Sequence, residues 1–312
     1  MTSFINKLFR KKAVSQAGSA TQGSKPENNQ TRLDGAPVNL ITPAITPPQI
    51  KHHLEIPQLL VGVGQSVGIQ RDHNEDSLFT LTTNLGSGEE SLYFGLYVIA
   101  DGMGGHENGE LASSIAVGQL TTHVINSLYL PIITDRSYKM DVSIQEVMHT
   151  GVIQAHQKIK QIALGAGTTL TAALILGEQM TIAHVGDSRA YSIDPLGKIH
   201  LLTHDHSLVK RLEEIGQISA EQASTHPQRN VLYQALGQGE IFEPDIKTMQ
   251  LQRGSQLIIC TDGLWGVISE NELVDVITSA PDPQLACQAL VYSANSAGGP
   301  DNISVILVRM PE

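Results

Sequence analysis

Four short acidic motifs carry the residues of this sequence that are best suited to chemistry. Asp101 and Asp262 each follow an apolar run, 92–99 and 256–260, that is typical of a buried strand. A carboxylate at the tip of a buried strand is costly unless a positive charge meets it. Converging carboxylates with glycines beside them suit hard divalent cations, whereas a single Asp equally suits a helix cap or a turn. The four motifs are Asn74-Glu75-Asp76, Ala100-Asp101-Gly102, Thr261-Asp262-Gly263 and Pro300-Asp301-Asn302.

The local charge around these carboxylates also indicates a metal. No Lys or Arg is adjacent in the sequence to Asp101, Asp262 or Asp301. We therefore expect the compensating positive charge to come from cations that are bound by oxygen ligands.

Eight motifs in a fixed order make the sequence similar to the protein phosphatase 2C (PPM) family of metal-dependent protein serine/threonine phosphatases, in its bacterial form. The first is Gly68-x-x-Arg71-x-x-Asn74-Glu75-Asp76-Ser77, and the second, 98–106, reads Val-Ile-Ala-Asp-Gly-Met-Gly-Gly-His. The resemblance covers about residues 61–309. The other motifs are Gly167-Thr168-Thr169, Val185-Gly186-Asp187-Ser188-Arg189-Ala190-Tyr191, Leu202-Thr203-x-Asp205-His206-Ser207-Leu208-Val209, His226-Pro227-x-Arg229-Asn230, Thr261-Asp262-Gly263-Leu264-Trp265 and Pro300-Asp301-Asn302-Ile303-Ser304.

The resemblance implies a site of two Mn²⁺ or Mg²⁺ ions. Asp101 is expected to bridge both ions, and Asp262 and Asp301 to complete the protein ligands of the first. Glu75 and the backbone carbonyl of Gly102 are expected to bind the second. Two such ions, about 3.5 to 4 Å apart, lower the pKa of a water, hold it in line with phosphorus and offset charge on the phosphoryl oxygens. Few carboxylates and many waters suit the octahedral shells of Mn²⁺ and Mg²⁺.

Three further residues receive a role from the same resemblance. Arg71 matches the arginine that binds phosphate, because a guanidinium holds two phosphoryl oxygens at once. Its alternative is a surface salt bridge to Asp72 or Glu75, which contributes little. Asp187 matches a carboxylate that holds a third, weaker ion in some relatives, although Gly-Asp-Ser by itself is a turn sequence. Asp76 is expected to position its neighbours by hydrogen bonds rather than to bind metal.

The sequence also departs from the family pattern. Met103 replaces a His that follows Asp-Gly in some relatives and that is a candidate proton donor. Bacterial members share this Met, so the general acid stays unassigned, with water on the metal or a nearby His (His73 or His106) as alternatives. Tyr233-Gln234 replaces a more usual Thr-Arg pair, which removes one positive charge from the segment expected to face the substrate.

Hydrophobic periodicity predicts the elements that position these motifs. Two runs of strands interrupted by a helix pair favour two antiparallel sheets with helices outside, and the resemblance implies the same α+β, αββα sandwich. Residues 225–240 are predicted to be a polar loop. Strands are predicted at 91–100, 168–176, 179–185, 189–193, 198–202, 256–260 and 303–309, and helices at 107–128, 142–163, 207–215, 219–224, 269–279 and 283–296.

The first 57 residues differ from the rest in composition. They hold six of the 14 prolines, which predicts a flexible tail before a phosphatase domain at 58–312. Phe4, Ile5, Leu8 and Phe9 share one helical face among basic residues, which is consistent with a short helix on an anionic membrane or a partner. The alternative is an unstructured basic terminus.

Composition narrows the function classes. The tail carries seven Lys/Arg against three Asp/Glu, and the remainder 13 against 28, so the domain is a poor partner for nucleic acid. Cys260 and Cys287 are too few for a zinc site or a disulfide scaffold and are expected to be buried thiols. The chain has no apolar run of membrane length and no secretory leader, so we expect a cytoplasmic monomer, at most peripheral to the inner membrane surface.

Three functions compete for this sequence. The first is hydrolysis of phosphoserine and phosphothreonine in proteins, opposing a serine/threonine kinase. The second is a non-catalytic module that keeps the fold, and the third is a two-metal phosphoesterase acting on nucleic acid or nucleotides. Every expected metal ligand is intact, which favours the enzyme, and the acidic domain argues against nucleic acid.

Overall fold

The computed structural model describes residues 58–87, 90–104, 107–135, 141–240 and 242–312. The expected tail with its amphipathic start lies outside these residues, as does His106. The division of the chain at residue 57 therefore stays a prediction. Within the described ranges, no helix is both long and apolar enough to cross a membrane.

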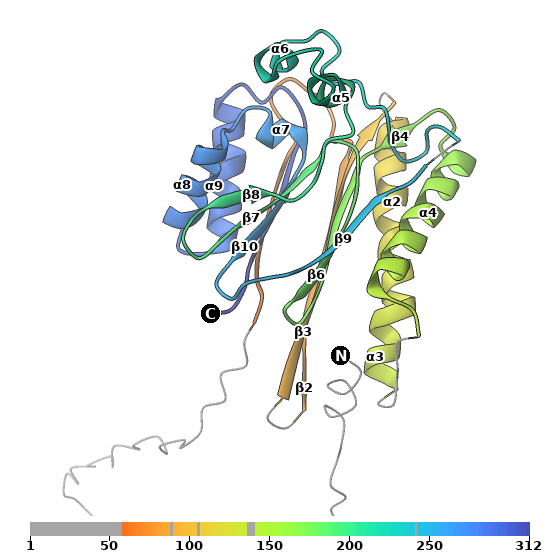
Figure 1. The fold of residues 1–312 in the computed structure, drawn as a ribbon, viewed down its shortest axis with the longest axis vertical. Helices are drawn as coiled ribbons and strands as arrows, with labels where there is room; N and C mark the ends of the chain where they lie inside the picture. Colours follow the sequence, from red (N-terminus) through yellow and green to blue (C-terminus); the bar gives the residue numbers. More distant parts are fainter. Residues whose placement is uncertain (1–57, 88–89, 105–106, 136–140, 241) are drawn as a thin grey trace, which may run out of the picture. The chain divides into compact units, whose positions relative to one another are not determined.

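Two antiparallel sheets form the centre of the fold (Figure 1). The first sheet has the order β1-β11-β10-β7-β8, and the second β2-β3-β5-β6-β9, with the short β4 paired to the end of β3. The strands of the first are Leu60–Ser66 (β1), Ile303–Arg309 (β11), Gln256–Cys260 (β10), Arg189–Ile193 (β7) and Ile199–Leu201 (β8). Those of the second are Asp76–Ser87 (β2), Glu90–Met103 (β3), Gly167–Thr168 (β4), Leu170–Leu176 (β5), Gln179–Val185 (β6) and Asp245–Gln250 (β9).

The two sheets pack against each other through one apolar layer. Tyr97 and Ile99 of β3 contribute to it from the second sheet. Ile259 of β10 and Ile306 of β11 contribute from the first, and all four are fully buried. Because successive side chains of a strand point to opposite faces, the intervening residues are left to pack on the outer sides.

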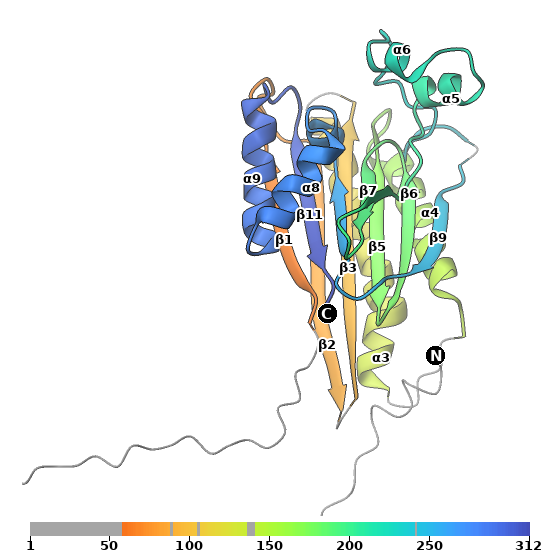
Figure 2. The same ribbon diagram turned by 60° about the vertical axis from the view of Figure 1, so that its left-hand side comes forward.

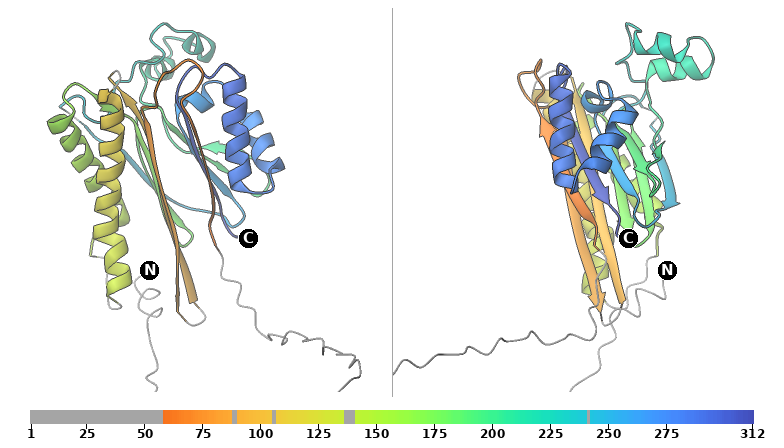
Figure 3. Two further views of the ribbon diagram at one scale, coloured as in Figure 1. Left: turned by 180° about the vertical axis from the view of Figure 1, so that it is seen from behind. Right: turned by 90° about the vertical axis from the view of Figure 1, so that its left-hand side faces the viewer.

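A pair of long helices covers the outer face of each sheet, as the sequence predicts. Helices α2 (Glu107–Val124) and α4 (Ile144–Ile162) share an apolar cluster with β3 and β5. Helices α8 (Glu270–Ser279) and α9 (Pro283–Ser296) share another with β10 and β11. Figure 2 shows α8 and α9 over β1 and β11, and Figure 3 shows the yellow-green and blue helices on opposite sides of the sheets. The predicted αββα sandwich is confirmed.

The structure differs from the predicted elements at a few places. Strands β1, β2 and β9 and the single turn α7 (Asp262–Trp265) were not predicted. The strand predicted over 168–176 is broken at Thr169, between β4 and β5. The helix predicted over 107–128 continues from α2 as a π-helical turn, Ile125–Tyr129, followed by α3 (Leu130–Thr134). Both cysteines are buried free thiols, as expected.

A helical segment lies between β8 and β9 at one end of the sandwich (Figures 1 and 2). We call residues 207–232 the α5–α6 segment, after α5 (Leu208–Glu214) and α6 (Ala220–Ser224). Ser207 caps α5, and Ser219 forms a capping box with Gln222, which is why both short helices begin where the sequence predicts. The two ends of the segment meet, because Ser207 pairs with Leu232 in an antiparallel bridge.

Candidate metal centre

The ends of strands from both sheets bring the expected carboxylates together. Asp101, near the end of β3, is in register with Asp76, the first residue of β2. Asp262 begins α7 directly after β10, and Asp301 precedes β11. Thr261 Oγ1 donates to Asp76 Oδ2 over 3.1 Å, so a hydrogen bond joins the two sheets at this end.

Burial raises the pKa of Asp101, Asp262 and Asp76. The pKa of Asp101 lies well above its usual value because of burial and because of the charges of Asp76, Asp262, Asp187 and Asp301. Burial raises the pKa of Asp262 to about 6, and the charge of Asp301 adds to the shift while a hydrogen bond with Asp101 opposes it. Burial also raises the pKa of Asp76 to about 7. Deprotonated carboxylates at this place therefore require a nearby positive charge.

The residues present fit divalent cations. Asp262 Oδ1 is buried without a hydrogen-bond partner among the described residues, which leaves a lone pair that a cation satisfies. At Gly102 a Cβ would lie 2.1 Å from Gly109 O and 2.7 Å from Glu75 O, so only glycine allows the close backbone approach. Oxygen donors of this kind are those that Mn²⁺ and Mg²⁺ prefer.

Glu75 is held at the centre by its backbone and by a neighbouring histidine. Asn302 Oδ1 accepts from Glu75 N over 2.8 Å, and the Asn302 amide donates to Val67 O and His73 O. His73 Nε2 lies 3.2 Å from Glu75 Oε1. Gly102 N donates to Glu75 O over 3.2 Å, so the two expected ligands of the second ion are joined directly.

Arg71 makes an ion pair that the sequence did not indicate. Its Nη2 lies 2.6 Å from Asp301 Oδ2, and this hydrogen bond raises the Arg71 pKa. The expectation that Asp301 has only metal to offset its charge is therefore wrong, as is the choice of Asp72 or Glu75 as the alternative partner. The two residues are 230 positions apart, so no local pattern reveals the pair.

Four polar residues support the carboxylates and were not among the expected site residues. Thr169 Oγ1 accepts from Asp101 N over 2.9 Å, and Ser304 Oγ donates to Asp76 Oδ2 over 2.7 Å. The hydrogen-bonding role expected of Asp76 is confirmed. Their only signal in the sequence was their place inside the quoted motifs. The four supporting residues are Thr169, Thr261, Asn302 and Ser304.

Asp187 lies beside the carboxylate group on the turn after β6. Gly186 adopts a φ of 103°, and a Cβ there would meet Thr169 Cγ2 at 2.6 Å, so the turn requires glycine. Burial raises the pKa of Asp187 to about 8, with the charge of Asp262 as the next cause. Trp265 Nε1 donates to Asp187 O over 3.0 Å and fixes the backbone at this turn.

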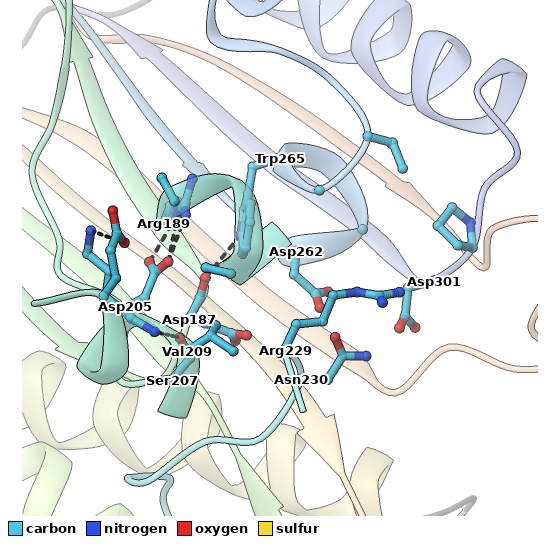
Figure 4. Close-up of a pocket in the computed structure, with 18 of the residues that line it drawn as sticks. Asp187, Arg189, Asp205, Ser207, Val209, Arg229, Asn230, Asp262, Trp265 and Asp301 are labelled. Atoms are coloured by element: carbon cyan, nitrogen blue, oxygen red, sulfur yellow. Dashed lines mark hydrogen bonds and ion pairs between the residues drawn. The ribbon is translucent and has the colours of Figure 1, made fainter. Parts of the chain in front are cut away.

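A pocket of about 650 Å³ opens onto this group of carboxylates (Figure 4). Asp187, Asp262 and Asp301 line one side, and residues of the α5–α6 segment line another. Arg71 and Arg229 bring positive charge to it. An anionic group that enters this pocket meets arginines as well as carboxylates, which suits a phosphate ester whose charge is also met by bound cations.

A second cluster near the segment has metal-type ligands but hydrogen-bonds internally. Donor atoms of His204, His206 and Asp245 lie within 4.8 Å of one another. Gly186 N donates to His206 Nδ1, so the neutral ring carries its proton on Nε2, which faces Asp245 Oδ2 at 3.3 Å. A metal ligand needs a free lone pair at that nitrogen, so we assign this cluster as a hydrogen-bonding one.

Comparisons with known proteins agree with this geometry. Residues 62–303 match the family model described as protein phosphatase 2C. The chain is 35% identical over 257 residues to protein phosphatase PhpP of Streptococcus pneumoniae, which covers 81% of this chain and 97% of PhpP. It is 37% identical over 239 residues to the serine/threonine phosphatase stp of Listeria welshimeri, covering 77% of this chain and 91% of stp.

Solved structures give the same result. The S. agalactiae serine/threonine phosphatase has a TM-score of 0.69 at 32% identity, covering 81% of this chain and all of that chain. The catalytic domain of the phosphatase PstP, solved with two manganese ions, has a TM-score of 0.65 at 25% identity and covers 82% of this chain and all of its own.

Proposed function

Because the chain belongs to the bacterial protein phosphatase 2C family of metal-dependent protein serine/threonine phosphatases, we propose that its pocket hydrolyses phosphoserine and phosphothreonine in proteins. The observation that carries the proposal is the convergence of Asp101 with Asp262 and Asp301 from two different sheets, where one buried carboxylate oxygen has no hydrogen-bond partner in the part of the chain that the structure describes. This arrangement concentrates negative charge where a cation-dependent reaction needs it.

Two Mn²⁺ or Mg²⁺ ions are the proposed cofactors. Asp101 would bridge both, Asp262 and Asp301 would hold the first, and Glu75 with the Gly102 carbonyl would hold the second. The two manganese ions of the PstP structure support this number. When bound, the ions supply a more acidic water and offset charge on the phosphoryl oxygens. Asp187 is the proposed ligand of a third, weaker ion, which it would share with Asp262.

The chain's own residues orient the phosphate and hold the ligands in place. Arg71 reaches the pocket as a half-exposed side chain and is proposed to bind two phosphoryl oxygens, with Asp301 holding its guanidinium in position. Asp76 orients Thr261 and Ser304 by accepting a hydrogen bond from each hydroxyl, and it stays outside the proposed ligand set. Met103 has no proton to donate, so no side chain at that position serves as the general acid.

Substrate partners follow from the same proposal. We infer phosphorylated proteins as substrates and, as the functional counterpart, a serine/threonine kinase that phosphorylates the same proteins. We also infer that the phosphatase is a monomer and acts in the cytoplasm. Two curated relatives are themselves a protein phosphatase and a serine/threonine phosphatase, which supports the substrate class. Contact of residues 1–12 with a membrane surface or a partner stays a prediction.

Hydrolysis of a phosphothreonine peptide with and without Mn²⁺ tests the function. The wild-type protein should release phosphate only with Mn²⁺ or Mg²⁺, and EDTA should stop it. Asp262→Asn should be inactive, whereas Asp275→Asn, on the exposed side of α8, should match the wild type. A protein that binds the peptide but releases no phosphate at any Mn²⁺ concentration would instead be the non-catalytic module. Full activity in EDTA would refute the two-ion site.

A further inference from the structure

The chain that enters the α5–α6 segment runs beside the turn after β6. Leu202 N donates to Ala190 O over 2.8 Å, and His206 N donates to Gly186 O over 2.7 Å. We call residues 202–206 the segment root. Backbone hydrogen bonds hold this root to residues on both sides of the turn, so the segment starts from a fixed position.

An ion pair strengthens the same junction. Arg189, at the start of β7, donates through Nε and Nη2 to both carboxylate oxygens of Asp205 in the root, over 2.7 to 3.2 Å. The Asp205 side chain is 7% exposed and the Arg189 side chain 21%. Arg189 Nη1 donates to Tyr191 Oη over 3.1 Å, so all three guanidinium nitrogens have a partner. A planar two-pronged pair of this kind fixes orientation as well as distance.

The other face of the guanidinium rests on an aromatic ring. The Arg189 Cζ lies 3.6 Å from the centroid of the Trp265 ring, which is cation–π geometry. Trp265 in turn donates through Nε1 to Asp187 O. Contacts thus run without interruption from Asp205 in the root to the wall of the pocket. Figure 4 shows Arg189 between Asp205 and Trp265.

These contacts determine what Arg189 can do in the reaction. The pocket is lined by Arg189, Asp205 and Trp265 together with Val209 and Ala223 of the segment. Because all three of its nitrogens already donate to protein groups, Arg189 cannot bind a phosphate through two hydrogen bonds. Arg71, by contrast, uses only Nη2 in its pair with Asp301. Its influence on a substrate passes through the position of the root and of the segment that forms the opposite wall.

We propose that Arg189, Asp205 and Trp265 are positioning residues that hold the α5–α6 segment over the pocket and thereby set the affinity for the peptide part of the substrate. The proposal rests on the proposed phosphatase function. A small aryl phosphate needs only the metal centre and Arg71. A phosphopeptide must also lie against the segment, so only the peptide should respond when the junction is loosened.

Steady-state kinetics on two substrates separate this role from a purely structural one. Arg189→Lys keeps the charge but loses the planar fork and the stacked face. Asp205→Asn keeps the shape and loses the charge. For both variants, KM for a phosphothreonine peptide should rise about tenfold or more, the effect of one lost hydrogen bond to a charged group. On p-nitrophenyl phosphate with Mn²⁺, kcat and KM should stay within about twofold of wild type, since the metal centre is untouched.

A matched control is available elsewhere on the chain. Arg253 pairs with Glu178 over 2.9 Å, and both side chains are more than half exposed. Arg253→Lys should leave both substrates unaffected, because an exposed pair contributes little and lies outside the pocket lining. Thermal melts of each variant show whether it is folded under the assay conditions.

The single tryptophan supplies a readout that does not depend on turnover. Trp265 is the only Trp in the chain, so its fluorescence reports on the junction and on the pocket wall beside it. Acrylamide quenching of Trp265 should increase in Asp205→Asn, where the guanidinium no longer stays on the ring, and should not change in Arg253→Lys. Titration of the phosphopeptide against this signal in EDTA gives its dissociation constant, which should weaken about tenfold in Asp205→Asn.

Opposite results would overturn the proposal. Equal losses on the peptide and on the aryl phosphate would mean that the pair acts on the chemistry or on the whole fold. An unchanged peptide KM and dissociation constant in both variants would mean that the junction positions nothing relevant to binding. If the wild type hydrolyses neither substrate with Mn²⁺, the proposed function fails, and the dissociation constants still decide on positioning.

Discussion

Replacing Asp262 by Asn should stabilise the metal-free protein at neutral pH while it removes activity. In the folded protein burial raises the Asp262 pKa from 3.8 to about 6. A carboxyl with a raised folded pKa binds more protons in the folded than in the unfolded state, so stability falls as pH rises through that interval. The destabilisation is absent below about pH 4 and complete above about pH 6. Asn cannot ionise and avoids it.

The size of the effect follows from the shift. The Asp262 pKa changes by about two units, and each unit corresponds to about 1.36 kcal/mol, so the charge costs about 3 kcal/mol. For a domain of this size, 1 kcal/mol moves Tm by about 2 to 4 °C. The metal-free variant should therefore melt about 6 to 12 °C above the metal-free wild type at pH 8.

Thermal melts in EDTA between pH 4.5 and pH 8 measure this difference. The difference in Tm between variant and wild type should be small at pH 4.5 and should grow until about pH 6 to 7. Groups that Asp262 does not affect, such as His184, whose buried ring has a pKa lowered to about 3, are present in both proteins and cancel. The charge of Asp262 raises the pKa of Asp101 and Asp187, so their titration adds to the difference above about pH 6. With Mn²⁺ the order should reverse, because only the wild type keeps a full set of ligands and gains from ion binding.

A flat difference across this pH range would refute the reasoning. It would mean that the carboxyl is hydrated or paired in the folded protein and does not experience the burial on which the metal site depends. A variant less stable than the wild type in EDTA at pH 8 would have the same meaning.

Four further outcomes are expected. Asp101→Asn should lower kcat by about 10³-fold or more at saturating Mn²⁺, measured on p-nitrophenyl phosphate, and near wild-type kcat would remove Asp101 as the bridging ligand. Arg71→Ala should raise the inhibition constant of inorganic phosphate by the equivalent of about 1.5 to 3 kcal/mol, and an unchanged constant would assign Arg71 to the Asp301 ion pair alone. Gly102→Ala should weaken Mn²⁺ binding in a calorimetric titration because its Cβ would lie 2.7 Å from Glu75 O, whereas Gly118→Ala, with nothing within 4 Å, should bind as the wild type does. Deleting residues 1–55 should leave kcat on p-nitrophenyl phosphate unchanged and should abolish salt-sensitive co-sedimentation with anionic vesicles; equal sedimentation of both forms would exclude a membrane role.

The sequence predicts the buried carboxylates better than their surroundings. Asp101 and Asp262 follow continuous apolar runs, and burial of such runs is a local property that periodicity reports. That Asp76 is in register with Asp101 depends on the pairing of β2 with β3, and β2 was not predicted. The Arg71–Asp301 pair joins two residues 230 positions apart, which only the complete fold brings together. Long-range pairing of this kind leaves no trace in the local pattern.

Strand β1 shows why some elements escape prediction. It contains Gly62 and Gly64. Glycine argues against a strand because it loses more backbone entropy on folding than other residues and has no side chain to pack. The structure supplies the reason for these residues. A Cβ at Gly62 would lie 2.0 Å from Pro283 O, and one at Gly64 would lie 2.9 Å from Cys287 O, so α9 rests directly on the strand's backbone. Tertiary packing thus overrides local propensity at this place.

The meeting of the two ends of the α5–α6 segment has a consequence for how such enzymes diversify. Leu208 N donates to Val231 O over 2.8 Å, and Tyr233 N donates to His206 O over 2.9 Å, so the chain leaves and re-enters the sandwich at one place. The entropic cost of closing a loop between adjacent ends depends only weakly on the loop's length. Insertions, deletions or recombination inside the segment therefore leave the strand register and the carboxylates unchanged. Evolution, or a protein engineer, can exchange this stretch as an independent module to alter substrate range while the hydrolytic machinery is inherited intact.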